Sequence, residues 1–335
     1  ISATNVDVLY PRPRRSRNVG LWFRDLSTTA PAVVHPDKYQ KVSMQPVLVR
    51  VRVPEKASAG EYRGKVKVSA SGRTFEVPIA LYVADWTVPD PREFRTYMGV
   101  YQSPTSVALQ YKLEPWRDEH FKKLEKSFDL LARVGNKMVN IPVVDETQFG
   151  NPEGMIWFVR KRDGSWGYDF RHFDRYMKMV VDKCGRQDLV CLQIWHAGGW
   201  KARKLDNKCR VQVVDEKTGK RAPMQVPAWG KPEAVKFWKP FFAAVQARLK
   251  KLGMPKAMTV GILSDSTAPN EVFQTMSDAW PDGTARWHRG CHGTTGSKTP
   301  YSVTKVGKNV VTLHEHCYGM CMVRPEEWRT PLCDL

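Results

Sequence analysis

The feature of this sequence that most constrains its fold is a change in hydrophobic period near residue 90. Before it, in Val47–Val53 and Val66–Val68, valines alternate with other, mostly basic, residues, which is typical of β-strands with one buried face. After it, apolar residues recur at helical spacing between short apolar strands. The segment Trp86–Arg92 (WTVPDPR) lies at the change, and its prolines favour an extended connector. The sequence therefore predicts two domains, residues 1–90 and residues 91–335.

The first domain is predicted to be an antiparallel β-sandwich module. Ala59-Gly60 and Ser71-Gly72 lie between the apolar runs, where hairpins need turns, and Thr74–Val83 supplies another strand. Because successive residues of a strand point to opposite faces, we expect one buried apolar face and one basic face. Sheets with one apolar face are stable when that face packs on another layer.

The second domain is predicted to be an α/β barrel of the TIM type. Helical spacing marks Phe121–Leu131, Phe173–Cys184, Pro232–Leu252 and Glu271–Trp280. Apolar strands are expected at 97–102, 138–144, 189–196, 258–265, 285–292 and 310–317. Alternating strands and helices imply parallel strands with helical crossovers. About six strands are present where a complete barrel has eight, so we expect an incomplete barrel or an open sheet.

Long insertions are predicted after two of these strands. Residues 145–168 follow the second strand and residues 197–230 follow the third; the latter contains a hairpin-like segment, Arg210–Val214 with Thr218-Gly219. Loops at the carboxyl ends of parallel strands are where barrel proteins build their functional sites. Candidate site residues are therefore sought at these strand ends.

Three stretches of the chain resemble glycoside hydrolase family 123 and its glycoside-hydrolase-like relatives. They are PVLVRVRVPEKASAGEYRGKVKV, FEVPIALYVADWTVPDP and FRTYMGVYQSP. The resemblance runs from about Pro46 to Gly293 and is most specific at the linker. It implies a β-sandwich joined to a (β/α)8 barrel, an extracellular or periplasmic location, and hydrolysis of N-acetylgalactosaminides assisted by the substrate's own acetamido group.

The resemblance also implies an Asp-Glu pair at the end of the fourth barrel strand. In the family the Asp orients the acetamido group and the Glu is the general acid. Here the strand reads GILSDSTAP, so Asp265 matches the Asp and Ser266 stands in place of the Glu. A hydroxyl cannot donate a proton as a carboxylic acid does near neutral pH. The family mechanism therefore does not carry over whole.

Three carboxylates are the candidate catalytic residues. Asp265 is the best placed, Glu315 lies in the sixth strand, and Asp145 follows the second, next to Glu146. A glycosidase needs two carboxyl groups flanking the sugar, or one group plus substrate assistance. The alternatives are that Asp265 caps the helix that follows Pro269 and that Asp145 lies in a solvated loop.

Aromatic and histidine side chains near the same strand ends are the candidate substrate-binding residues. They are Tyr101, Trp195, His196, Trp200, Trp229, His288, His292 and His314. Aromatic rings can stack on the apolar faces of sugars. The alternative for most of the aromatic residues is ordinary packing in the core. The arrangement of His314, His316, Cys317 and Cys321 matches no common zinc spacing, so we expect no metal and no other cofactor.

The charge balance limits the class of partner. The chain has 53 Lys and Arg against 34 Asp and Glu, a net charge of +19, and such a field attracts polyanions. No nucleic-acid-binding motif accompanies the charge, so we expect a glycan or polysaccharide, including an anionic one. No apolar run of about 18 residues is present to span a membrane, and oligomeric state is left open.

Two functions remain open from the sequence. One is a glycoside hydrolase with Asp265 as its central acid. The other is a non-catalytic glycan-binding or structural surface protein on a hydrolase-like scaffold, which Ser266 favours because the family acid is missing. The same fold supports both.

Overall fold

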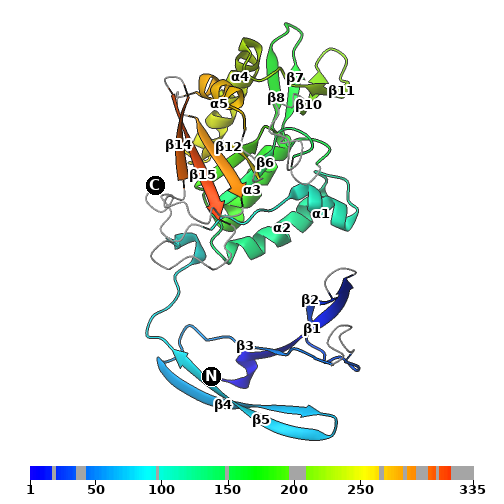
Figure 1. The fold of residues 1–335 in the computed structure, drawn as a ribbon, viewed down its shortest axis with the longest axis vertical. Helices are drawn as coiled ribbons and strands as arrows, with labels where there is room; N and C mark the ends of the chain where they lie inside the picture. The colour runs from blue at the N-terminus through cyan, green and yellow to red at the C-terminus, as the bar shows by residue number, and fades with distance from the viewer. Residues whose placement is uncertain are drawn as a thin grey trace. The chain divides into compact units, whose positions relative to one another are not determined.

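The structure is a computed structural model, and its chain divides into two compact units, Ile1–Pro89 and Asp90–Leu335 (Figure 1). It describes residues 1–16, 20–34, 43–95, 98–147, 151–195, 209–263, 268–281, 285–291, 301–306 and 309–317. Each unit is considered by itself below. Within these residues, no helix combines the length and apolar character needed to cross a membrane.

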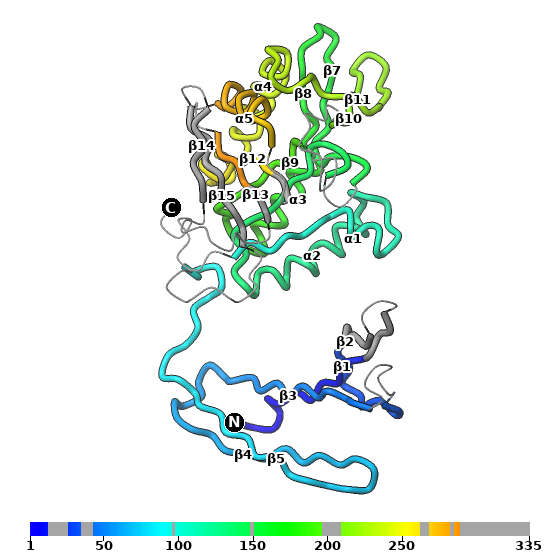
Figure 2. The backbone as a smooth tube through the Cα atoms, in the orientation of Figure 1, coloured from blue at the N-terminus to red at the C-terminus, as the bar shows by residue number. Residues whose placement is uncertain are grey.

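The first unit contains two antiparallel sheets. The strands of the first are β1 (Val6–Ser16), β2 (Gly20–Ser27) and β3 (Leu48–Val51), in the order β2-β1-β3, and a short 3-10 helix, η1 (Ala3–Asn5), precedes them. Strands β4 (Gly60–Ala70) and β5 (Arg73–Val83) form a separate hairpin (Figure 2).

The turn of the β4–β5 hairpin was predicted correctly. Ser71 and Gly72 have φ angles of 50° and 74°, and positive φ at both central residues is the signature of the turn that suits a two-residue hairpin. The β4–β5 hairpin pairs in register along its whole length, from Ala70↔Arg73 to Gly60↔Val83.

The predicted β-sandwich is not confirmed. Leu9 and Val83 are the only hydrophobic side chains buried in the described part of the first unit, and Phe75 on β5 is 54% exposed. Val66 and Val68 share a face of the hairpin with Phe75 and Val77, as the alternation predicts, but they are half-buried at most. The alternation identifies the apolar face correctly, whereas nothing in a period of two specifies what covers that face.

The second unit is built on a six-stranded sheet. Its strands, in spatial order, are β14 (Tyr301–Val306), β15 (Asn309–Cys317), β13 (Arg286–Cys291), β12 (Met258–Leu263), β9 (Leu189–Gln193) and β6 (Met138–Pro142). The last five are parallel and neighbour one another in chain order. Five of the six predicted strands are therefore confirmed.

The prediction of a barrel needs correction on three points. No closed barrel is found among the described residues. Strand β14 was not predicted, and it is antiparallel to β15 at the sheet edge. The strand expected at 97–102 is reduced, in its described part, to one parallel bridge between Met98 and Asn136. The antiparallel pairing follows from the length of the connection. Only two residues separate β14 from β15, and a parallel pair would need a much longer crossover.

Helices cover one face of this sheet. They are α1 (Pro104–Tyr111), α2 (Asp118–Ala132), α3 (Arg171–Cys184), α4 (Pro232–Lys251) and α5 (Asn270–Ala279), after the 3-10 helix η2 (Pro91–Glu93). The last four α-helices confirm the predicted helical segments. Helix α1 was missed, although Ser103 caps it by accepting a hydrogen bond from the Ser106 amide, with Pro104 in its first turn.

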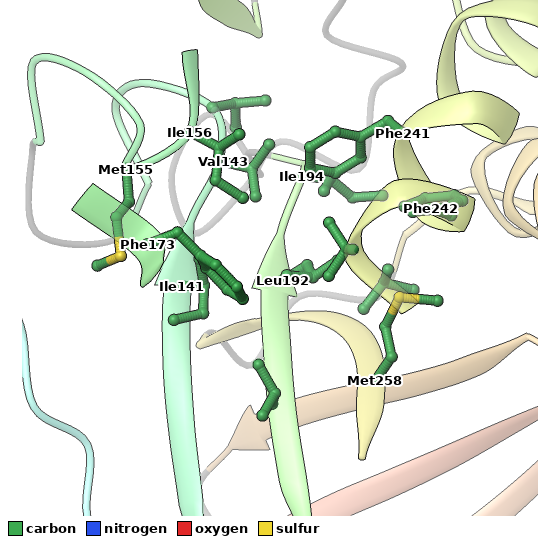
Figure 3. Packing of buried hydrophobic residues seen from close by; sticks show 14 of the residues in the cluster. Ile141, Val143, Met155, Ile156, Phe173, Leu192, Ile194, Phe241, Phe242 and Met258 are labelled. Atoms are coloured by element: carbon green, nitrogen blue, oxygen red, sulfur yellow. The ribbon is translucent and has the colours of Figure 1, made fainter. Parts of the chain in front are cut away.

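The core lies between the sheet and these helices. Alternate strand residues such as Val139, Ile141 and Leu192 are buried in one cluster with the apolar residues of α2 to α5. Figure 3 shows part of this cluster, with Ile141, Leu192 and Phe173 in the packed layer. The residues between them point to the opposite face, where Met138, Leu189 and Cys191 form a separate small cluster. The two faces of the sheet are therefore chemically different.

The two insertions combine into a second sheet, which we call the insertion sheet. Its strands are β7 (Trp157–Arg160), β8 (Trp166–Asp169), β10 (Arg210–Asp215) and β11 (Arg221–Gln225), in the order β11-β10-β7-β8. Strands β7 and β10 come from different insertions and pair in parallel. The Phe158 ring stacks on Phe237 of α4 at 4.9 Å between centroids, so the insertion sheet packs against that helix.

Candidate active site

A row of paired residues crosses the sheet, and those of its side chains that the structure describes lie on the face opposite the helices. Register places Pro142, Gln193, Gly261, His288 and His314 side by side on β6, β9, β12, β13 and β15. The Gln193 and His288 side chains are 2% and 1% exposed. Polar groups buried in this way need hydrogen-bond partners. This row, which we call the polar row, lies at the carboxyl end of β9 and extends across the neighbouring strands.

Tyr101 joins the polar row from the segment before α1. Its hydroxyl lies 3.5 Å from Gln193 Oε1 and accepts a hydrogen bond from Gln193 Nε2 at 3.2 Å. The adjacent Gln102 accepts a hydrogen bond from the buried Tyr176 hydroxyl at 3.1 Å. The structure therefore brings the predicted binding residue Tyr101 to the carboxyl end of β9, and it places a second predicted binding residue, His288, in the polar row.

Gly261 occupies the position between Gln193 and His288. A Cβ atom at Gly261 would overlap the backbone carbonyl oxygen of His288, so strands β12 and β13 approach too closely there for any side chain. The polar row therefore has no side chain between Gln193 and His288. Gly261 precedes Asp265 by four residues in the sequence.

Asp145 lies after the carboxyl end of β6, and its carboxylate is occupied. It is 4% exposed and accepts hydrogen bonds from the Arg210 amide at 3.0 Å and from Arg210 Nε at 2.6 Å. The neighbouring Glu146 side chain is 66% exposed, with one oxygen 3.1 Å from Arg210 Nη2. The structure gives Asp145 the role of joining the two insertions, and its catalytic role stays a prediction.

A second, partly buried carboxylate also connects the insertions. Glu153 accepts hydrogen bonds from Trp116 Nε1 at 2.9 Å and from Arg221 Nη1 at 2.8 Å. The Arg221 guanidinium lies 4.2 Å from the centroid of the Trp157 ring. The insertion sheet is thus bonded to the segment between α1 and α2 as well as to the end of β6.

The predicted tryptophans lie in the core. Trp195 and Trp229 are both buried, with Trp195 tilted against Trp287 and Trp229 stacked on Trp238 at 5.6 Å. These contacts correspond to the packing alternative stated for the aromatic residues. Contact of either ring with a sugar stays a prediction.

The remaining candidates lie wholly or partly outside the described residues. Asp265, His196, Trp200 and His292 are not among those residues. For Glu315 and His314 only the backbone of β15 is described, in register with Arg289 and His288. The catalytic role of Asp265 therefore stays a prediction.

Sequence reasoning missed Gln193 and Asn140. Each is a polar residue within an otherwise apolar strand, LVCLQ and MVNIP, and both are buried. They share the face opposite the helices, since Asn140 pairs with Cys191. A polar residue that interrupts a buried strand is the signal that could have identified them.

Three of the seven cysteines have described side chains. Cys184, Cys191 and Cys209 are buried, and burial raises the pKa of Cys184 to about 11 and that of Cys191 to about 12. A protonated thiol is neither a nucleophile nor a good metal ligand. No group of His, Cys, Asp and Glu suited to a metal ion occurs within the part of the chain that the structure describes.

The chain belongs to glycoside hydrolase family 123. The family's catalytic domain matches residues 101–281, which is more than half of the chain and includes Tyr101, Gln193 and the insertion sheet. This match confirms the resemblance seen in the sequence. No curated protein matches the chain significantly.

A solved structure has a similar fold. It is a family 123 glycoside hydrolase from Clostridium perfringens, described for the hydrolysis of glycolipid glycans, with a TM-score of 0.62 and 16% sequence identity. The similarity covers 87% of this chain and 52% of that protein, so this chain spans about half of its length. At this identity the comparison supports the fold.

Proposed function

We propose that this protein is a glycoside hydrolase whose site lies at the carboxyl ends of β6, β9, β12 and β13. The observation that carries the proposal is the family match over residues 101–281, because these residues supply Tyr101 and Gln193 of the polar row. Its substrate is a glycan, and its location is extracellular or periplasmic, as the resemblance implies.

The parallel sheet is proposed to be part of a (β/α) barrel. Strands β6, β9, β12, β13 and β15 neighbour one another in chain order without a reversal. A doubly wound sheet reverses its order at a switch point, whereas a barrel does not. The strand order of a barrel places functional residues at the carboxyl ends of several strands.

Asp265 is proposed as the central catalytic residue. It follows Leu263, the last residue of β12, and β12 lies between the strands of Gln193 and His288. In the proposed reaction Asp265 orients the substrate's acetamido group, and the general acid comes from a strand other than β12. Glu315 is favoured over Asp145 for this acid, because the Asp145 carboxylate is already bonded to Arg210.

The test uses the full-length protein and a broad panel of glycans that includes N-acetylgalactosaminides. Asp265→Asn is expected to lower turnover by about 100-fold or more while binding persists, since removal of one group that stabilises the transition state electrostatically costs about 10²–10³. Ser266→Glu restores the family pair and is expected to raise N-acetylgalactosaminidase activity. Binding without any hydrolysis by the unsubstituted protein would reject the enzyme and support the alternative, a non-catalytic glycan-binding protein.

A further inference from the structure

Two charged turns lie next to each other at one end of the insertion sheet. The first, residues 161–165, connects β7 to β8, and the second, residues 216–220, connects β10 to β11. Parallel pairing of β7 with β10 places Arg160 opposite Asp215. The Glu216 amide donates to the Arg160 carbonyl at 3.0 Å, and the Arg162 amide donates to Glu216 Oε2 at 3.0 Å. These bonds join the two turns directly.

The carboxylates of these turns bond to the turns' own backbone and hydroxyl groups. Asp163 accepts hydrogen bonds from the Ser165 amide and hydroxyl at 2.9 and 2.6 Å. Asp215 accepts from the Thr218 amide and hydroxyl at 2.8 and 3.0 Å. Hydrogen bonds from Ser165 and from Thr218 lower the pKa of Asp163 and of Asp215 respectively. The acidic groups therefore fix the turn conformations.

The basic side chains of the same turns have no such partners. Lys161, Arg162, Lys217 and Lys220 are exposed. None of the four forms an ion pair with a carboxylate of the described chain, in contrast to Arg210 and Arg221 of the same sheet. We call these four residues, together with Arg160, the basic-turn surface.

We propose that the basic-turn surface binds an anionic glycan, namely a polysaccharide that carries sulfate or uronic-acid groups. Residues 161–165 and 216–220 contain no aromatic or large apolar side chain. Stacking on unpaired bases needs exposed aromatic rings, and interfacial membrane binding needs an apolar face. A hydrophilic polymer with repeated anionic groups needs only spaced cations, which the two turns supply. This binding does not depend on hydrolysis, so it goes beyond the proposed function.

The experiment compares two variants of the full-length protein with equal net charge. In the turn variant Lys161, Arg162, Lys217 and Lys220 are changed to Ser. In the control variant four exposed lysines from elsewhere, Lys56, Lys126, Lys236 and Lys239, are changed to Ser. Binding to immobilised heparin and to polygalacturonate is measured at an ionic strength of about 0.15 M and at lower salt.

The turn variant is expected to bind at least about tenfold more weakly than the control variant, because four exposed charge contacts of modest strength are lost together. The difference should grow as salt is lowered. Equal weakening in both variants would show that net charge alone is responsible, and unchanged binding in the turn variant would exclude the surface.

Duplex DNA and vesicles containing an anionic phospholipid are competitors in the same assay. If either binds through the two turns as tightly as heparin and polygalacturonate do, the assignment to a glycan is wrong. Hydrolysis of the glycan panel is measured separately on the turn variant. Retained hydrolysis with lost heparin binding separates this surface from the active site.

Discussion

At the scale of single residues, the carboxylates near the candidate active site differ in whether they are bonded within the fold or exposed. Asp145 and Glu153 are bonded to arginines of the insertion sheet, so both stabilise the fold. Glu146, next to Asp145, keeps a mainly exposed carboxylate. The sequence presents Asp145 and Glu146 as equivalent neighbours. Their different environments depend on Arg210, 64 residues or more away in the chain, which no local pattern reveals.

Substitution of Asp145 tests this difference. Asp145→Ala is expected to lower the free energy of unfolding by about 2 kcal/mol or more, because hydrogen bonds to a charged partner are lost from a buried position. Glu146→Ala should cost under about 1 kcal/mol, since its ion pair is exposed. Urea denaturation measures both. If Asp145→Asn is stable but has lost hydrolysis, the result would instead support a catalytic role for Asp145.

At the scale of elements, segments with a strong internal period were predictable and segments held by distant partners were not. Helix α2 shows the first case, with Phe121, Leu124 and Phe128 buried on one face. Strands β7 and β8 show the second, because they have only four residues each and β7 pairs with β10 of the other insertion. The polar row was missed in part for a similar reason, since Gln193 finds its partner in Tyr101.

The close approach of β12 and β13 gives a prediction at this scale. Gly261→Ala is expected to destabilise the protein by about 2 kcal/mol or more, because the new Cβ forces the two strands apart. Gly64→Ala on β4 is the matched control, since nothing lies within 4 Å of a Cβ built there. Thermal unfolding distinguishes the two variants. Equal stability of both proteins would mean that β12 and β13 can move apart at position 261 without a loss of stability.

At the scale of the whole molecule, the two units differ in how much they bury. The second unit contains nearly all of the buried hydrophobic side chains, whereas the first unit has Leu9 and Val83 among its described residues. The change of hydrophobic period near residue 90 predicts two kinds of structure. It could not reveal this difference in burial, because burial depends on what packs over each face.

Hydrogen exchange of the backbone amides tests the difference in burial. Amides of β4 and β5 are expected to exchange much faster than those of β6 and β9, because an isolated two-stranded hairpin is marginally stable and a buried sheet is protected. Exchange followed by mass spectrometry in the full-length protein measures both regions together. Equal protection of the hairpin would show that another chain segment or molecule covers its apolar face.

The parallel pairing of β7 with β10 also limits how the two insertions can be re-engineered. A graft that takes residues 145–168 from a relative without residues 197–230 would leave one strand of that pair without its partner, and Asp145 and Arg210 would be separated into different parents. Exchange of both segments together keeps β7 paired with β10. It also keeps the ion pairs Asp145–Arg210 and Glu153–Arg221 within one parent. Chimeras of this protein should therefore take residues 145–168 and 197–230 from the same parent.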